Sequence, residues 1–412
     1  MKSFKEYIAE ASAEGKNLHM THIEDQVIYG GVKGAREAIL ALRSLRDMLA
    51  GNAKTSTDVT VKWDGAPAVF AGIDPSDGQF FVAKKGIFNK NPKIYKSVSD
   101  VRADTSGDLA DKLSIAFNEL QKLGIKGVLQ GDIMFTQKDL SVEEYDGEKY
   151  ITFQPNTIVY AVPADSDVAK SIKKAKIGVV FHTRYSGATL ETMKASYDFD
   201  QSELKKTPSV WFQDAKVHDL SGKATFTAEE TAELTARLSV AGKIFQKINS
   251  STLKEIEDNP DFAQSLETFN NTYVRRGEVV SNTKAHVDNL IKWATDRFNK
   301  DIESKKSEKG KETASAKRDQ YMKFFSDENK KNLNLVYQLQ NAIIDAKRLI
   351  INKLDTLKKL STFVRTSSGF RVTGQEGFVA IDHLSGGAVK LVDRMEFSKN
   401  NFSADIIKGW DR

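Results

Sequence analysis

The chain of 412 residues contains no cysteine, which excludes disulfides, thiolate metal sites and cysteine nucleophiles. No apolar run approaches the ~18 residues that cross a membrane, and residues 1–7 lack the apolar region of a signal peptide. A strong charge of one sign is also missing, because 61 Lys+Arg against 56 Asp+Glu leave a net charge of +5. That excess is too small to establish a polyanionic partner by itself. We therefore expect a soluble, cytoplasmic protein with no membrane contact.

The order of the expected elements predicts an α+β fold. With 40% apolar residues the chain can bury a substantial core, and its length favours two domains or one domain with a large insertion. Apolar residues at helical spacing predict helices over 34–49, 108–123 and 166–175, and β-rich runs separated by turns predict strands. The expected strands cover 58–63, 67–73, 79–88, 126–135, 149–162, 176–185, 369–381 and 387–393.

Helical periodicity takes over near residue 225 and continues to about 360. Thr227 and Glu230 have the spacing of a capping box, and a long apolar stripe predicts a last helix that opens at Asp327. The predicted domains are therefore a discontinuous α/β body of residues 1–225 and 361–412, and a helical insertion of residues 226–360.

The residues with the most distinctive spacing are Lys62, Asp64 and Gly65, in a K-x-D-G arrangement at the end of an expected strand. Lysine has an unperturbed pKa of ~10.4 and becomes a nucleophile when neighbouring cations or burial lower that pKa. A strand end followed by a tight turn would fix the backbone so that Lys62 can point into a cleft, and Asp64 could orient its amine or a ribose hydroxyl. The alternative is an ordinary hairpin turn with a solvated lysine.

Three further segments place polar side chains beside apolar runs. Asp132 ends the run 127–130 and could bind a ribose hydroxyl or support a metal, with a surface turn as the alternative. Glu376 precedes the apolar segment 377–381 and could help to hold Mg²⁺, which favours carboxylates together with phosphates and water. Lys390 lies amid apolar neighbours and could neutralise a phosphate, or else be an edge-strand lysine.

Other candidates are less distinctive. Lys85 follows a strand and could contact a phosphate, and Phe181 could stack on a nucleobase or simply belong to the core. His19 and His22 stand near two carboxylates early in the chain, a pattern that metal sites use but that lacks further ligands here.

Taken in order, these segments resemble the covalent nucleotidyltransferase superfamily of ATP-dependent DNA ligases, RNA ligases and mRNA-capping enzymes. The segment 62–65 resembles its motif I, 84–86 its motif Ia, 131–133 its motif III, 180–181 its motif IIIa, 376–379 its motif IV and 389–391 its motif V. The resemblance covers roughly residues 55–220 and 365–400.

The resemblance implies a ligase-type adenylation domain and a role for each residue. Lys62 would be the nucleophile that becomes adenylylated, with ATP as the nucleotide and Mg²⁺, or Mn²⁺, as the metal. Glu376 and Asp132 would support the metal, Asp132 would also bind the ribose, and Phe181 would stack on the base. Lys85 and Lys390 would hold phosphates.

Departures from the pattern point to a subfamily. Pro67 stands where DNA ligases and capping enzymes usually carry arginine. Phage RNA ligases commonly lack that arginine too. Val392 replaces the second lysine of motif V, and Asp132 stands where glutamate is commoner. The chain leaves no room for a C-terminal OB-fold after motif V. It also resembles proteins of tailed phages, which would place it in the host cytoplasm.

The function implied is ATP-dependent polynucleotide ligation, of RNA rather than DNA. Two alternatives stay open: adenylylation of a protein or small-molecule acceptor, and a non-catalytic phage structural or interaction protein with a decayed ligase fold. Residues 241–360 carry 23 Lys+Arg and 17 Asp+Glu, an excess of +6. Cations of this insertion could follow a nucleic-acid backbone, or form a solvated helix face; they are Lys292, Arg297, Lys300, Lys305 and Lys306.

Overall fold

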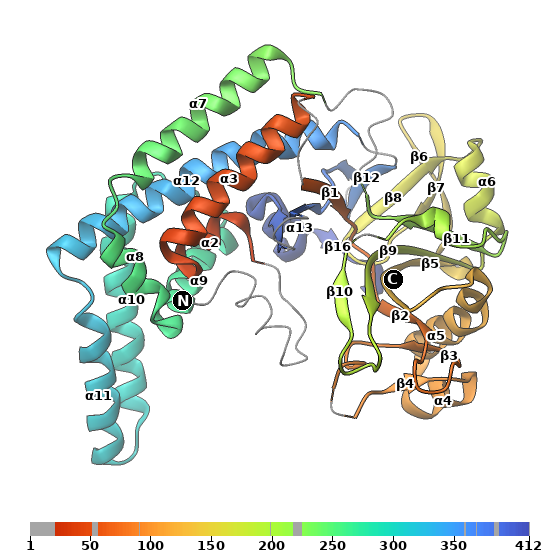
Figure 1. Ribbon diagram of the computed structural model, residues 1–412, viewed down its shortest axis with the longest axis horizontal. Helices are drawn as coiled ribbons and strands as arrows, with labels where there is room; N and C mark the ends of the chain where they lie inside the picture. Colours follow the sequence, from red (N-terminus) through yellow and green to blue (C-terminus); the bar gives the residue numbers. More distant parts are fainter. Residues whose placement is uncertain are drawn as a thin grey trace.

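The computed structural model describes residues 21–51, 57–89, 91–197, 199–216, 225–357, 360–367, 369–382 and 387–411. A helical body and a strand body lie side by side, and β1, β12 and α13 lie between them (Figure 1). In the described part of the chain, no helix combines the length and the apolar character that crossing a membrane requires.

The helical body is built around α12 (Asp327–Asp355), which packs against α3 (Gly31–Leu49) and α7 (Ala228–Phe245). Its other helices are α2 (Gln26–Tyr29), α8 (Ser250–Glu257), α9 (Pro260–Arg276), α10 (Thr283–Ser304) and α11 (Glu308–Met322). Apolar residues from α2 and α3 belong to the same core cluster as those of α7 to α12. The helical body is therefore larger than the predicted insertion, because N-terminal helices complete it.

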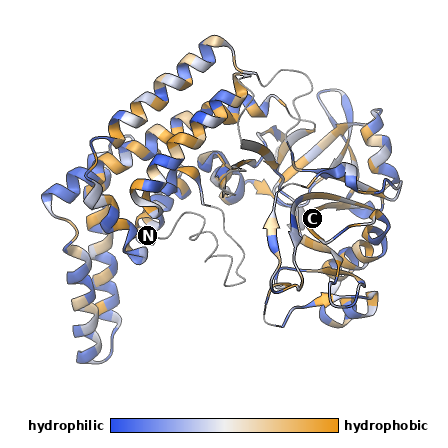
Figure 2. Ribbon diagram, viewed as in Figure 1, coloured by the Kyte–Doolittle hydropathy of each residue, from blue (hydrophilic) through white to orange (hydrophobic). Residues whose placement is uncertain are grey.

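Local signals explain where these helices begin. At α7, the Thr227 hydroxyl accepts a hydrogen bond from the Glu230 backbone N–H, and the Glu230 carboxylate accepts one from the Thr227 N–H, which confirms the predicted capping box. Helix α12 begins at Asp327, with Ser326 as its cap. Helix α11 is largely hydrophilic, and the one buried residue described in it is Ala314 (Figure 2).

The strand body consists of separate sheets. The first has the order β1 (Thr57–Lys62), β14 (Gly377–Asp382), β15 (Gly387–Leu391). The second has the order β10 (Lys194–Ser196), β9 (Ile177–Ser186), β5 (Val128–Thr136), β2 (Ala68–Ile73), β3 (Phe80–Ala83), β4 (Ile94–Tyr95), with β11 (Val210–Asp214) parallel to β9. The third has the order β13 (Gly369–Val372), β12 (Ser361–Thr366), β8 (Ile158–Pro163), β7 (Glu148–Phe153), β6 (Ser141–Tyr145), with β16 (Ile406–Ile407) paired to β12.

Helices and the third sheet cover the second sheet. Helix α5 (Gly107–Leu120) buries Leu113 and Leu120 in one core cluster with Val69 and Leu129 of the second sheet. A further core cluster joins side chains of the second and third sheets, including Phe135. The remaining helices of this body are α4 (Val98–Asp104), α6 (Asp167–Lys174) and α13 (Arg394–Phe402). Short 3₁₀ segments lie at Ile23–Asp25 (η1), Gln121–Leu123, Gln137–Asp139, Gln201–Glu203 and Gly409–Asp411.

The predicted α+β class is confirmed, and the sheet pairings are antiparallel except for β11 with β9. Two predicted strands are each divided. The run 149–162 forms β7 and β8 with a polar connection between them, and the run 369–381 forms β13 and β14.

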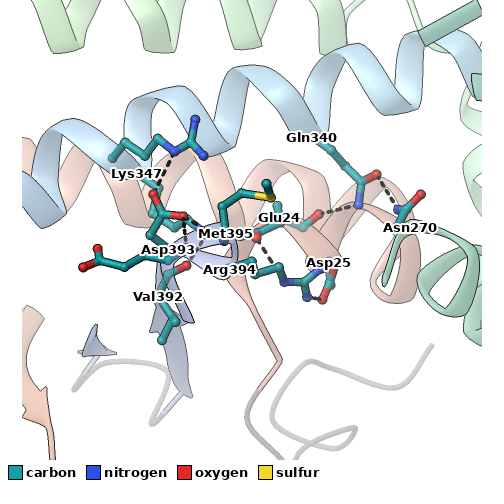
Figure 3. Close-up of polar contacts among 11 residues, drawn as sticks. Glu24, Asp25, Asn270, Gln340, Lys347, Val392, Asp393, Arg394 and Met395 are labelled. Atoms are coloured by element: carbon teal, nitrogen blue, oxygen red, sulfur yellow. Dashed lines mark hydrogen bonds and ion pairs between the residues drawn. The ribbon is translucent and has the colours of Figure 1, made fainter. Parts of the chain in front are cut away.

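A buried ion cluster joins the helical body to the end of β15. The Lys347 amine of α12 binds both Glu24 carboxylate oxygens at 2.9 and 2.8 Å and also donates to the Val392 carbonyl at 2.9 Å (Figure 3). Arg394 pairs with Glu24 at 3.4 Å and with Asp25. Burial opposes the ionisation of Glu24, but the charges of Lys347 and then Arg394 outweigh it and lower its pKa to about 2.

The ion cluster also accounts for the two carboxylates that follow His19 and His22 and that resemble part of a metal site. His19 lies outside the described residues, while Glu24 and Asp25 are occupied by Lys347 and Arg394. Among the described residues there is no group of three or more His, Cys, Asp or Glu side chains that could hold a metal ion. The carboxylates next to His22 therefore serve an internal ion cluster.

Replacing Lys347 with methionine should be strongly destabilising, because it leaves Glu24 buried without its main counter-charge. We expect a loss of about 3–5 kcal/mol in the free energy of unfolding, measured by urea denaturation. The matched control is Lys353→Met on the same helix, whose partner Glu230 is 40% exposed. That control should cost about 0–1 kcal/mol, and equal losses for the two variants would contradict the assignment.

Candidate active site around Lys62

Lys62 is the last residue of β1 and lies opposite Gly377, the first residue of β14. This register places the Lys62 amine in an ion pair with the Glu376 carboxylate. The Lys62 side chain is 28% exposed and that of Glu376 10%, so the pair is reached by solvent mainly from the lysine side. Glycine is needed at 377 because its φ is +151° and a Cβ there would lie 2.7 Å from the Leu391 carbonyl oxygen.

The turn after Lys62 is pressed against β5. The Ala66 N–H donates to the Ile133 carbonyl, and the Ile133 N–H donates to the Pro67 carbonyl, each at 3.0 Å. A Cβ on Gly65 would lie 2.4 Å from the Cβ of Asp132, so no larger residue fits there without a shift. The glycine of the K-x-D-G turn therefore sets how closely Lys62 and Asp132 approach.

Asp64 has a different role from the one predicted. Its carboxylate accepts hydrogen bonds from the Asn156 side-chain amide at 2.6 Å and from the backbone N–H groups of Thr157 and Ile158 at 2.7 and 2.8 Å. Its own N–H donates to the Tyr160 hydroxyl at 2.7 Å. Both oxygens are thus used to tie the turn to the β7–β8 connection, and orienting the Lys62 amine is not among its contacts.

The two carboxylates near Lys62 have unusual protonation behaviour. Burial raises the pKa of Asp132 to about 7, against the opposing charges of Lys62 and Lys85. Burial also raises the pKa of Glu376 to about 7, although the charge of Lys62 pulls it down. Strongly shifted carboxyl groups gathered around a lysine are a feature of functional sites.

The predicted phosphate-binding lysines, Lys85 and Lys390, lie near the Lys62–Glu376 ion pair. Lys390 lies on β15 opposite Val379 of β14, and its pKa is lowered by burial and then by the charge of Lys62. Lys85 is exposed just after β3, near enough for its charge to act on Asp132. The structure therefore brings Lys62, Lys85, Asp132, Glu376 and Lys390 to one site.

Phe181 does not belong to this site. Its side chain is fully buried in the core cluster with α5, where its ring meets the edge of Phe199 at a centroid distance of 5.8 Å. The prediction that it stacks on a base is therefore wrong: at its position β9 points the side chain to the opposite face of the sheet.

The next residue, His182, faces the site and was missed. Its Nε2 lies 3.7 Å from an Asp132 carboxylate oxygen, and its side chain is 29% exposed. Its own pKa is lowered to about 4 by burial and then by the charge of Lys62. The sequence alone could not bring His182 to Asp132, because it does not give the register in which β9 pairs with β5.

The two carboxylates, Asp132 and Glu376, fit a magnesium ion whose remaining ligands come from substrate phosphates and water. Asp132 and Glu376 supply hard oxygen ligands, and Mg²⁺ is usually bound by one or two carboxylates plus substrate phosphates and water. A site of this type does not need the cluster of three ligands that is absent among the described residues.

A family model matches residues 17–406, nearly the whole chain. The chain belongs to DUF6267, a family of unknown function. No protein of curated function matches this DUF6267 chain, and no solved structure matches it either. Its chemistry has to be argued from its own residues.

Replacing Asp132 with asparagine should stabilise the protein at pH 8 and leave its stability almost unchanged at pH 4. A carboxyl group with a raised pKa holds its proton in the folded state while the unfolded chain has released it, so stability falls as pH rises from about 4 to about 7. Asparagine removes that loss.

We expect a gain on the order of 1–3 kcal/mol at pH 8, discounted because the side chain is partly exposed. Urea denaturation at both pH values measures it. An equal effect at pH 4 and pH 8, or a loss of stability at pH 8, would show that Asp132 is not held in this environment.

Proposed function

We propose that this DUF6267 protein is an ATP-dependent nucleotidyltransferase that carries AMP on Lys62 and joins polynucleotide ends, RNA in preference to DNA. The observation that carries the proposal is the convergence of Lys62, Asp132, Glu376 and Lys390 on one site from distant parts of the chain. Those residues are also the ones whose segments resemble covalent nucleotidyltransferases.

The first step would form a bond between the Lys62 nitrogen and the α-phosphorus of ATP. The bond from that phosphorus to the bridging oxygen breaks, and pyrophosphate leaves with the electron pair. Lys62 must lose its proton for this attack, and Glu376 is hydrogen-bonded to it with a pKa raised to about 7 by burial. Glu376 is therefore placed to take that proton near neutral pH before a metal ion binds its carboxylate.

The cations would stabilise charge on the phosphates. Lys390 and Lys85 flank the carboxylates of the site and could neutralise the negative charge that develops on the phosphate oxygens during transfer. A Mg²⁺ ion held by Asp132 and Glu376 would supply further charge neutralisation. Asp64 and Gly65 would act indirectly, by fixing the turn that carries Lys62.

The second and third steps need a polynucleotide. The oxygen of a 5′-phosphate would displace Lys62 from the α-phosphorus, and a 3′-hydroxyl would then attack that 5′-phosphate and release AMP. Lys292, Arg297, Lys300 and Lys306 of the helical body are exposed cations available for a phosphate backbone, whereas Lys305 is paired with Asp301 at 2.8 Å. The preference for RNA rests on Pro67, which stands where DNA ligases usually carry arginine.

Incubation with α-³²P-ATP and Mg²⁺, followed by denaturing electrophoresis, should label the wild-type protein through an acid-labile bond. Lys62→Ala should abolish the label because it removes the amine that would carry the nucleotide. Lys126→Ala, which removes an exposed lysine from outside the site, should label like the wild type. Labelling of Lys62→Ala at the wild-type level would refute the proposal, and α-³²P-GTP in parallel tests the base.

Sealing of a nicked duplex should be faster when the broken strand is RNA than when it is DNA. Lys292→Ala combined with Lys300→Ala should weaken RNA binding and its dependence on salt, while leaving adenylylation of Lys62 unchanged. Label without sealing of any polynucleotide would favour a protein or small-molecule acceptor. Absence of label on folded protein free of bound AMP would favour a non-catalytic protein.

A further inference from the structure

His182 lies at a β-bulge between β5 and β9. Gln130 pairs with Thr183 and the next residue, Gly131, pairs with Phe181, so His182 is the extra residue on β9. A bulge of this kind leaves one residue unpaired and re-aims the side chains beside it. His182 lies two residues after Val180, which pairs with Asp132, so His182 faces the side of the sheet that carries Asp132, while Phe181 lies in the core behind the sheet.

Gly131 makes the bulge possible. A Cβ at this position would lie 2.4 Å from the Val180 carbonyl oxygen and 3.0 Å from the Phe181 ring. The backbones of β5 and β9 therefore approach closely only because residue 131 has no side chain. The glycine that directly precedes Asp132 thus allows the strands that carry Asp132 and His182 to approach each other.

The imidazole of His182 is held in one orientation. Its Nδ1 lies 2.7 Å from the Thr183 hydroxyl oxygen, and Thr183 is buried. In a neutral imidazole one ring nitrogen donates and the other accepts. If the Thr183 hydroxyl donates to Nδ1, the proton lies on Nε2, the nitrogen nearer to Asp132.

Asp132 and His182 do not bond each other directly. The 3.7 Å between Nε2 and the carboxylate oxygen is longer than a hydrogen bond. A hydroxyl group can donate one hydrogen bond and accept another, so one hydroxyl can satisfy an acceptor carboxylate and a donor N–H together. The side chains are 21% and 29% exposed, and a ligand can therefore reach both.

We propose that His182, together with Asp132, binds a ribose hydroxyl of the nucleotide and makes the site selective for ribonucleotides over 2′-deoxyribonucleotides. The hydroxyl donates to Asp132 and accepts from Nε2 of His182. This inference rests on the proposed function, and it assigns the nucleotide contact to His182 where the sequence pattern pointed to Phe181. An analogue without the hydroxyl leaves both polar groups unpaired, which is how sites built around a hydroxyl reject such analogues.

The experiment measures binding of ATP and of 2′-deoxy-ATP by titration calorimetry in a Lys62→Ala background, where turnover cannot occur. The ratio of the two dissociation constants is compared for His182→Ala, His182→Asn and His182→Gln. Glutamine places its amide nitrogen near the position of Nε2, whereas asparagine reaches only as far as Nδ1. Ser186→Ala, at the exposed end of β9, is the matched control.

We expect the preference for ATP to fall about three- to tenfold in His182→Ala and His182→Asn, the effect of losing one neutral hydrogen bond. Glutamine should restore most of it, and the Ser186 control should leave it unchanged. An unchanged ratio in His182→Ala would overturn the inference. If that variant does not fold, Thr183→Val tests the same orientation, and an unchanged ratio there has the same consequence.

The failures of the two proposals are distinguishable. Binding of ATP with the expected ratios by a protein whose Lys62 never becomes labelled would support the role of His182 and overturn nucleotidyl transfer. Labelling of Lys62 with the same ratio in every His182 variant would overturn the role of His182 alone. Failure of the Lys62→Ala protein and of the wild type to bind either nucleotide would overturn both.

Discussion

The antiparallel pairing of β1 with β14 is the contact on which the Lys62 site depends. It joins residues 57–62 to residues 377–382, and its register sets Lys62 opposite Gly377. Because Glu376 directly precedes Gly377, this register delivers a carboxylate to the lysine amine. A slip of one residue would turn Lys62 to the other face of the sheet.

The helical body supports this pairing from behind. Val59 of β1, Phe378 of β14 and Leu391 of β15 are buried in the same core cluster as the helices. Lys347 of α12 donates a hydrogen bond to the Val392 carbonyl and pairs with Glu24 (Figure 3). The helices between β11 and β12 therefore do more than extend the molecule. They form part of the core against which the strands carrying Lys62, Glu376 and Lys390 are packed.

The sequence predicts the helices and strands well because their signals are local. It does not predict the roles of individual site residues, because contacts between distant parts of the chain determine them. Helical periodicity and the capping box at Thr227 predict α7 because their physics is local. The role of Asp64 depends on the segment that connects β7 to β8, about 90 residues away in the sequence. The sequence pattern predicts one continuous strand over 149–162 and so does not reveal this connection. Phe181 lies in the core and His182 at the site because neighbouring residues of β9 point to opposite faces, and the pairing of Val180 with Asp132 decides which face carries the site.

The charges of the site favour a polyphosphate even before a metal is considered. Lys62, Lys85 and Lys390 lie near Asp132 and Glu376, and burial raises the pKa of both carboxyl groups to about 7. Near neutral pH these groups are partly protonated, so the cations outweigh the anions. Burial and the charge of Lys62 lower the pKa of Lys390, which shows that the lysines are held against their mutual repulsion. An incoming triphosphate would relieve that repulsion and compete with Glu376 for the Lys62 ammonium. On this argument nucleotide binding would free the Glu376 carboxylate from the resting ion pair, and Lys62 would still have to lose its proton before it attacks.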